Sequence, residues 1–145
     1  ESVIKYQHER FKRSGIPYTV ALIDLDYFKS INDKHGHEVG DKVLSMTAHC
    51  LKCAVRKQDI VARWGGEEFI VLLPDTNLQG AVIVAQKVRK EIYQEEIMID
   101  GHPISVTATI GLAEIMDGQS FEACLNFADT LLYQGKKEGR DRVVF

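Results

Sequence analysis

The feature that most constrains the fold of this chain is a pair of glycines between two apolar runs. Gly65 and Gly66 separate residues 60–62 from residues 69–73, and a glycine pair in that position predicts a tight turn between antiparallel strands. Glycine reaches positive φ without steric cost and lets another molecule approach the backbone closely. Two glutamates follow the turn at once, so the hairpin presents carboxylates that suit a hard divalent cation. The alternative is an ordinary hairpin with solvated charges.

Length and charge exclude several classes of protein. At 145 residues the chain can bury a substantial core, and we expect residues 1–145 to form one domain. A formal net charge of −3 disfavours a nucleic-acid polymer as partner, because such proteins usually carry a basic face. No apolar run approaches the roughly 20 residues that cross a bilayer, and the first residues do not resemble a signal peptide.

The cysteines indicate the compartment. Their number, three, is odd and gives no disulfide framework, which favours a reducing, cytoplasmic environment and leaves open a membrane-anchored parent protein. Cys50 and Cys53 form a C-x-x-C inside an apolar helical pattern, and we expect both to pack in the core. His35 and His37 flank a glycine and are expected in a turn. Trp64 is expected to be a core residue, with base stacking as the alternative.

Hydrophobic periodicity and turn residues predict the order of the elements. A second hairpin is expected from residues 97–99 and 104–113, the latter run alternating like a strand with one buried face. Thr76 or Asn77 is the candidate cap of one helix, and Ser120 of the last. In order, we expect a helix at 2–13, a strand at 18–23, helices at 29–34 and 39–55, the glycine hairpin, a helix from 77 to about 92, the second hairpin, a helix after 120 and an edge strand at 142–145.

This order predicts an α+β fold, with a central mixed, largely antiparallel sheet flanked by helices on both faces. The strand that ends at Asp24 and the hairpin that carries Glu67 would be neighbours in that sheet. Asp26 and Glu68 add two more carboxylates at strand ends, where a rigid sheet fixes their geometry. Two carboxylates together with substrate phosphates are the usual way in which proteins hold Mg²⁺.

Two further pairs of residues point to a nucleotide. Asn32 and Asp41 lie on either side of a break at Gly36, and an amide with a carboxylate can recognise the edge of guanine. Lys136 and Arg140 are four residues apart near a predicted helix end, a spacing that lets both meet terminal phosphates on one face.

These residues together carry a resemblance to a known bacterial family. The segments that match, in order and with suitable spacing, are residues 24–33 (DLDYFKSIND), Gly36-His37, Gly40-Asp41, residues 63–69 (RWGGEEF), Ala128-Asp129, Leu132-Tyr133 and residues 136–140. The chain resembles the GGDEF family of diguanylate cyclases through nearly its whole length. The resemblance implies a sheet similar to those of nucleotidyl cyclases and polymerase palms.

The resemblance also implies an activity and a site. The activity is a nucleotidyltransferase reaction that joins two GTP molecules into cyclic di-GMP and releases two pyrophosphates, in a homodimer with two domains facing each other. Asp24, the Leu25 carbonyl and Glu67 would ligate Mg²⁺ or Mn²⁺, and Glu67 and Asp24 would be catalytic. GTP would be bound by Asn32, Asp41, His37, Tyr27, Phe28, Lys29, Gly65, Gly66, Lys136 and Arg140, with Tyr27 and Phe28 contributing backbone amides.

A second motif, R-x-x-D at Arg56 and Asp59, implies a site where the product inhibits the enzyme. Arg89 or Lys90, of the same or a partner domain, would add a contact there. The alternative for this motif is a surface charge pair. An upstream sensory or receiver domain is implied in the full-length protein. The alternative function is a catalytically silent module that binds cyclic di-GMP or GTP.

The chain departs from the family pattern in a few places. Glu67 stands where the family name has aspartate, a variant found in active members. Gly135 replaces the usual alanine, which would loosen the helix end, and Asp141 replaces a common asparagine, which would weaken phosphate binding. The D-x-L-T-x-L-x-N-R segment that normally precedes the domain is absent.

Overall fold

A computed structural model describes residues 2–145 of the chain as alternating helices and strands. Most of the predicted elements are present, with ends shifted by a few residues. In chain order they are α1 (Ser2–Ser14), β1 (Thr19–Leu25), α2 (Phe28–His35), α3 (His37–Ala54), β2 (Ile60–Arg63), β3 (Glu68–Leu73), α4 (Leu78–Gln94), β4 (Ile97–Ile99), β5 (His102–Ile104), β6 (Ala108–Glu114), α5 (Phe121–Lys137) and β7 (Arg142–Val144).

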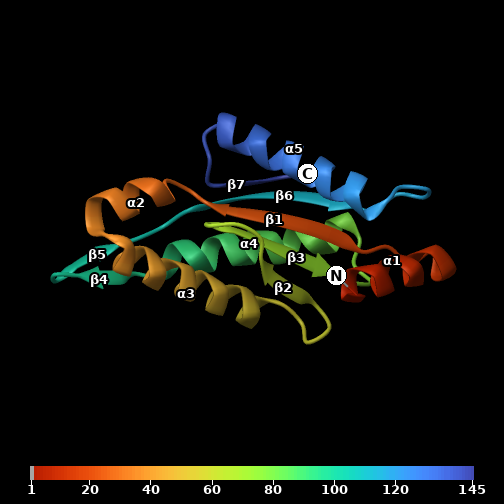
Figure 1. The fold of residues 1–145 in the computed structure, drawn as a ribbon, viewed down its shortest axis with the longest axis horizontal. Helices are drawn as coiled ribbons and strands as arrows, with labels where there is room; N and C mark the ends of the chain where they lie inside the picture. Colours follow the sequence, from red (N-terminus) through yellow and green to blue (C-terminus); the bar gives the residue numbers. More distant parts are fainter. Residues whose placement is uncertain (1) are drawn as a thin grey trace.

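Five strands form the central sheet in the order β2-β3-β1-β6-β7 (Figure 1). The middle strand β1 pairs antiparallel with β3 and β6, and β2 pairs antiparallel with β3. Only the edge strand β7 runs parallel to its neighbour β6. The predicted mixed, largely antiparallel sheet is therefore confirmed.

Helices cover both faces of this sheet, as predicted (Figure 1). Ala21, Ile23 and Leu25 of β1 share a buried cluster with residues of α3 and α4. Val20 and Leu22 point the other way and pack with residues of α1 and α5. Because β1 is buried on both faces, its sequence is almost continuously apolar.

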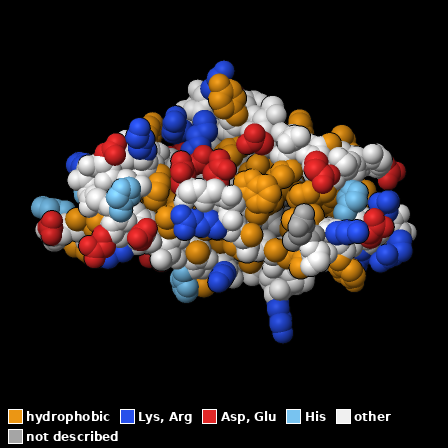
Figure 2. All heavy atoms as spheres, viewed as in Figure 1, with side chains coloured by type: hydrophobic (Ala, Val, Ile, Leu, Met, Phe, Trp, Pro, Cys, Tyr) orange, Lys and Arg blue, Asp and Glu red, His pale blue; other side chains and the backbone are white. Residues whose placement is uncertain are grey.

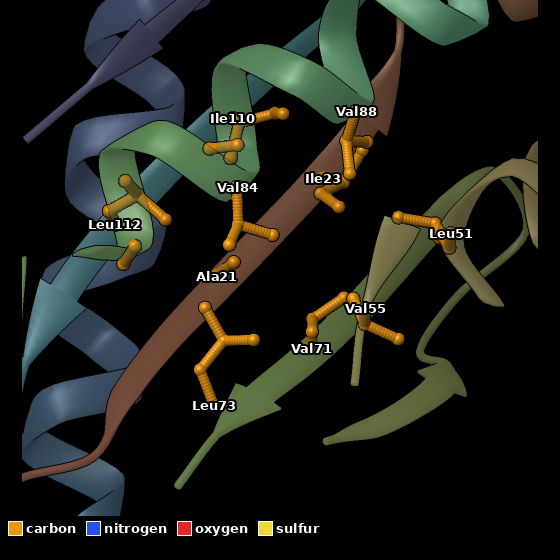
Figure 3. Close-up of a pocket in the computed structure, with 12 residues that line it drawn as sticks. Ala21, Ile23, Leu51, Val55, Val71, Leu73, Val84, Val88, Ile110 and Leu112 are labelled. Carbon is orange, nitrogen blue, oxygen red and sulfur yellow. The ribbon is translucent and has the colours of Figure 1, made fainter. Parts of the chain in front are cut away.

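Aliphatic side chains line the space between the middle of the sheet and helices α3 and α4. Figure 3 shows Ala21, Ile23 and Val71 of the sheet facing Val84 and Val88 of α4, among other aliphatic residues. This space is the hydrophobic core, which leaves the ends of the strands as the place for polar chemistry.

Two helix caps follow the sequence prediction. The Asn77 side chain accepts a hydrogen bond from the Gly80 amide at 2.9 Å, and the Ser120 side chain accepts one from the Ala123 amide at 3.1 Å. Each cap satisfies an amide that the first helical turn leaves without a partner.

The prediction for the second hairpin was partly wrong. β4 pairs with β5, which ends at Ile104, and the chain then leaves that small sheet before β6 begins at Ala108. The alternating pattern continues through this break and hides it. The prediction of one buried face was also wrong, because residues 108–113 are buried on both sides, under α4 and under α5.

Two other burial predictions were wrong. Trp64 is 52% exposed beside the glycine turn. Cys50 is buried as expected, but Cys53 lies one helical turn further on the exposed side of α3. Within residues 2–145, no helix has the length and apolar character needed to cross a membrane.

Candidate active site

The end of β1 and the glycine turn lie side by side, as predicted. Asp24 is paired in register with Glu68 of β3. One residue later the Leu25 amide donates a hydrogen bond to the Glu67 carbonyl at 3.3 Å. The carboxylates of both segments therefore project at one end of the sheet.

Arg63 holds the shape of the glycine turn. Its guanidinium donates hydrogen bonds to the Gly66 carbonyl at 2.7 Å and to the Gly65 carbonyl at 3.2 Å. The Trp64 amide closes the turn by donating to the Glu68 carbonyl at 2.8 Å. Because Arg63 binds the Gly65 and Gly66 carbonyls, the backbone of the two glycines has a fixed position next to Glu67.

Excess negative charge gathers at this point. Burial raises the pKa of Asp24 to about 6, and although Lys136, 3.4 Å away, opposes that rise, Glu67 and Glu68 add to it. Burial also raises the pKa of Glu68, assisted by Asp129 and Glu67. Carboxylates that repel one another in this way are suited to share a divalent cation.

The donors present fit such a cation. Within residues 2–145, no three His, Cys, Asp or Glu side chains converge as a complete metal centre. A site that uses Asp24, Glu67 and the Leu25 carbonyl needs no third side chain, because Mg²⁺ in nucleotide enzymes completes its shell with substrate phosphates and water.

Asp26 has a different environment, which the sequence did not reveal. Its side chain is fully buried, with Lys136 Nζ at 2.8 Å from Oδ1. The hydroxyls of Thr107 and Thr109 each donate to it at 2.7 Å, and the Asp141 amide donates at 3.0 Å. Burial alone would raise the pKa of Asp26, but these hydrogen bonds hold it below its ordinary value.

The start of α2 lies directly after the end of β1 and offers positive groups there. Tyr27 precedes the helix and has a left-handed backbone conformation, with φ of 56°. No side chain caps the helix. The first amides of a helix have no partner within it and attract anions. Phe28 is buried, so only its backbone can serve this purpose, while Lys29 is exposed. Figure 2 shows acidic and basic side chains side by side in the middle of the displayed face.

Arg140 reaches the start of α2 from the turn that follows α5. Its guanidinium lies 4.7 Å from the centroid of the Tyr27 ring and donates to the Lys136 carbonyl at 3.2 Å. Arg140 Nε is buried and, within residues 2–145, has no hydrogen-bond partner. A buried cationic donor without a partner beside uncapped amides fits an anionic ligand.

The route by which Arg140 arrives differs from the prediction. α5 ends at Lys137, so Lys136 and Arg140 do not share a helix face. Gly139, Arg140 and Asp141 all have positive φ and turn the chain sharply back toward β7. α5 nevertheless continues regularly past Gly135, which is buried, so this glycine does not loosen the helix end.

Asn32 and Asp41 are brought together by a close approach of α2 and α3. The Asn32 amide oxygen lies over Gly40, at the place where a side chain on Gly40 would stand. Asp41 is the next residue and borders a hollow between α3 and β2. That hollow is lined by Asp41, Leu44, Ser45, Ala48, Lys52, Val61, Ala62, Arg63 and Phe69. His37 begins α3 and is exposed.

A second hollow lies on the α5 side of the carboxylates. It is lined by Asp24, Glu68, Asp129, Thr130, Leu132, Tyr133 and Lys136. Asp129 and Tyr133 belong to the matching segments of the sequence, but only the structure places them beside Asp24. Tyr133 is exposed, with Lys137 Nζ 4.7 Å from its ring centroid.

The R-x-x-D residues form a local pair. Arg56 Nη2 lies 3.2 Å from Asp59 Oδ1 and also donates to the Pro74 carbonyl and the Thr76 hydroxyl. Arg89 does not join them within this chain, because its guanidinium contacts Gln86 and Asp141. The predicted contribution of Arg89 or Lys90 from a partner domain stays a prediction.

Comparison with known proteins agrees with this geometry. The family model described as "Diguanylate cyclase, GGDEF domain" matches residues 1–142. Diguanylate cyclase A of Treponema denticola is 43% identical over 126 residues, which are 86% of this chain and 34% of that protein. Diguanylate cyclase DgcP of Pseudomonas aeruginosa is 40% identical over 134 residues, 92% of this chain and 20% of that protein. The chain thus spans about a third or less of these relatives.

Solved structures share the fold. Diguanylate cyclase SiaD of Pseudomonas aeruginosa, in complex with its activator SiaC, superposes with a TM-score of 0.94 at 39% identity, over 98% of this chain and 55% of that one. The active GGEEF domain of a Vibrio cholerae diguanylate cyclase gives 0.92 at 28% identity, over 99% and 91%. By motif, fold and sequence, this chain belongs to the GGDEF domain family of diguanylate cyclases.

Proposed function

We propose that this chain is the catalytic domain of a diguanylate cyclase, which condenses two GTP molecules into cyclic di-GMP and two pyrophosphates. The observation that carries the proposal is the arrangement at the end of β1. There Asp24 and the Glu67 segment face the uncapped start of α2, Lys136 and the unpartnered Arg140 Nε. A triphosphate and a divalent cation need this combination of charges.

The guanine base is assigned to the α3 side of the site. The hollow beside Asp41 has apolar walls from Leu44, Val61 and Phe69, which suit the faces of a base. The Asp41 carboxylate accepts from the guanine N1 and exocyclic amine, and Asn32 completes the recognition of the edge. Adenine presents no such pair of donors, so these residues favour GTP over ATP.

The phosphates are assigned to the end of β1 and the start of α2. The Tyr27 and Phe28 amides hold the terminal phosphates together with Lys136 and Arg140, and Lys29 and His37 add positive charge or hydrogen bonds at the rim. Gly65 and Gly66 carry no side chain, so the triphosphate approaches the turn closely.

The reaction is a displacement at the α-phosphorus. A Mg²⁺ or Mn²⁺ ion held by Asp24, Glu67 and the Leu25 carbonyl would neutralise triphosphate charge and acidify the attacking hydroxyl. Glu67 accepts the proton of the 3′-hydroxyl of one GTP, whose oxygen bonds to the α-phosphorus of the other. The bond from that phosphorus to the bridging oxygen breaks, and pyrophosphate leaves. The same step in the opposite direction closes the ring.

Each domain binds one GTP, so turnover requires two copies related by a two-fold axis. We further propose that cyclic di-GMP inhibits the enzyme at Arg56 and Asp59. The planar Arg56 guanidinium is half-exposed, and the buried Asp59 carboxylate holds it in place. A Caulobacter crescentus relative, the GGDEF domain of DgcB, has been solved in complex with c-di-GMP; its structure superposes with a TM-score of 0.94 at 27% identity, over 97% of this chain and 84% of that one.

The matched relatives are several times longer than this chain, which supports an upstream sensory or receiver domain in the parent protein. Consumption of GTP supports a cytoplasmic location for the domain.

The test is Glu67→Gln, compared with Glu96→Gln as a control at an exposed position between α4 and β4. With GTP and Mg²⁺, we expect Glu67→Gln to lose cyclic di-GMP formation while its melting temperature stays that of a folded domain. Glu96→Gln should keep the wild-type rate. Unchanged turnover in Glu67→Gln would remove Glu67 from the mechanism.

A further inference from the structure

Asp26 lies two residues from the proposed metal ligand Asp24, but its surroundings differ completely. Asp24 lines the hollow on the α5 side together with Glu68 and Asp129, whereas the Asp26 side chain is fully buried. A carboxylate offers about four lone-pair positions. Thr109 and Lys136 donate to Oδ1, and Thr107 and the Asp141 amide donate to Oδ2. The carboxylate is therefore saturated by the protein itself.

The four donors come from three parts of the chain. Thr107 precedes β6 and Thr109 lies within it, Lys136 is in the last turn of α5, and Asp141 ends the left-handed turn that leads to β7. Asp26 itself follows β1, and its amide donates to the Thr107 carbonyl at 2.9 Å. One buried charge thus joins the end of β1, β6, α5 and the turn at residues 139–141.

Two of these connections bear on the groups assigned to the phosphates. Lys136 Nζ is 2.8 Å from Asp26 but 3.4 Å from Asp24, so Asp26 is its nearer counter-charge. Arg140 lies immediately before Asp141 in a turn of three residues with positive φ, a conformation that non-glycine residues adopt only when the surroundings fix it. The hydrogen bond from the Asp141 amide to Asp26 contributes to that fixation, together with the one from the Arg140 amide to the Gly135 carbonyl.

We infer that Asp26 is a positioning residue for the phosphate-binding cations: it ligates no metal, and it sets the place of Lys136 and of the Arg140 turn relative to Asp24. This inference rests on the proposed function only in assigning those cations to the phosphates of GTP. Asparagine keeps an oxygen that accepts from the Asp141 amide but loses the charge that pairs with Lys136. The inference therefore predicts that Asp26→Asn acts through Lys136 and that the two residues are energetically coupled.

The test is a double-mutant cycle of Asp26→Asn and Lys136→Met, with Asp117→Asn as a control at an exposed loop position. The ligand is 3′-deoxy-GTP with Mg²⁺, which cannot condense, and binding is measured by calorimetry. We expect Asp26→Asn to weaken binding about tenfold in the wild-type background, the scale of a charge-assisted hydrogen bond. In the Lys136→Met background it should cause less than about a twofold further loss, since the partner is gone. Equal losses in both backgrounds would overturn the inference.

Thermal melting supplies a readout that does not depend on nucleotide. Asp26→Asn should lower the melting temperature of the wild type. In the Lys136→Met background that loss should shrink by at least half, because Asp26 is there a buried charge without its cation and its removal costs less. An unchanged loss would contradict the coupling. If the wild type failed to bind 3′-deoxy-GTP, the proposed function would fall, while this melting experiment would still decide the coupling.

Mn²⁺ binding, followed by the paramagnetic resonance of free Mn²⁺, separates positioning from ligation. In the Lys136→Met background, Asp26→Asn should leave Mn²⁺ affinity within about twofold, because Asp26 ligates no metal and Lys136, through which its charge acts, is absent. A tenfold loss there would make Asp26 a metal ligand and refute the inference.

Discussion

The two aspartates at the end of β1 should affect stability in opposite directions when each is changed to asparagine. In the absence of metal, Asp24 is a carboxylate with a raised pKa, and Asp26 is one with a lowered pKa. The amide of asparagine removes the charge of each side chain and keeps its shape. We therefore expect Asp24→Asn to stabilise the metal-free domain and Asp26→Asn to destabilise it.

The sign for Asp24 follows from proton linkage. In the folded state Asp24 keeps its proton up to about pH 6, whereas in the unfolded chain it releases the proton near pH 3.8. The stability associated with this proton is fully present below the unfolded pKa and is lost as the pH rises from about 4 to about 6. At pH 7.5 the folded state therefore carries an unfavourable charge, which Asp24→Asn removes.

The size of the effect can be worked from the same values. The rise of the Asp24 pKa from 3.8 to about 6 corresponds to about 3 kcal/mol. The Lys136 contact already opposes this rise, so its loss needs no separate subtraction. The expected gain is therefore about 3 kcal/mol at pH 7.5, or a rise of about 6 to 12 °C in melting temperature.

Asp26→Asn has the reverse sign because its charge is paired and fully hydrogen-bonded. Its contribution is present above the unfolded pKa and is lost as the pH falls through the lower folded pKa. Removal of one partner from a buried pair costs about 3 to 5 kcal/mol.

The assay is urea unfolding in EDTA at pH 7.5 and pH 4. Asp24→Asn should be more stable than the wild type at pH 7.5 and nearly equal to it at pH 4, with cyclic di-GMP formation abolished. Added Mg²⁺ should stabilise the wild type more than Asp24→Asn. A loss of stability in Asp24→Asn at pH 7.5 without metal would refute the electrostatic reasoning.

Three further substitutions test other parts of the account. Gly40→Ala places a methyl group where the Asn32 oxygen lies, so calorimetry should show about tenfold weaker GTP binding, while the helix-favouring alanine keeps the melting temperature unchanged or higher. Gly135→Ala sets a methyl 2.7 Å from the Thr109 methyl, and we expect urea unfolding to show a loss of about 1 kcal/mol, overpacking outweighing helix propensity. Arg56→Ala should relieve inhibition by added cyclic di-GMP in steady-state assays without lowering the initial rate.

Two of these substitutions have a matched control variant. Gly80→Ala lies in the first turn of α4 with more room than Gly135, so it should not lose stability, and a loss there equal to that of Gly135→Ala would remove the packing explanation. Lys57→Ala, an exposed neighbour of Arg56, should leave product inhibition intact. Equal relief by both would place the inhibitory site elsewhere.

Local signals predicted the elements well where one physical cause dominates. Asn77 and Ser120 cap helices because their side chains satisfy amides that no other group reaches. The start of β6 was missed because the alternation of apolar and polar residues from Ile104 onward continues through the point at which the chain changes sheets. The periodicity of a segment indicates which of its faces is buried, but it does not identify the strand with which the segment pairs.

The sequence predicts which residues belong to the site, but it predicts the role of each residue only in part. Asp24 and Glu67 were expected at neighbouring strand ends; β1 pairs Asp24 with Glu68, and the Glu67 carbonyl accepts from the Leu25 amide. The separate role of Asp26 depends on Thr107 and Thr109, more than 80 positions later, and on the turn after α5. No local pattern distinguishes a saturated carboxylate from one that is open to a ligand. Trp64 was misjudged for a similar reason, since its residue type is typical of a core while its 52% exposure depends on tertiary packing.

The central claim is tested most directly by incubating the purified domain at high concentration with GTP and Mg²⁺ and identifying the nucleotides by mass spectrometry, before and after heat release of bound ligand. The account predicts cyclic di-GMP and pyrophosphate formed from GTP, and none from ATP. Intact GTP, both with the wild type and with Arg56→Ala freed of bound product, would contradict it and leave a module that only binds nucleotide.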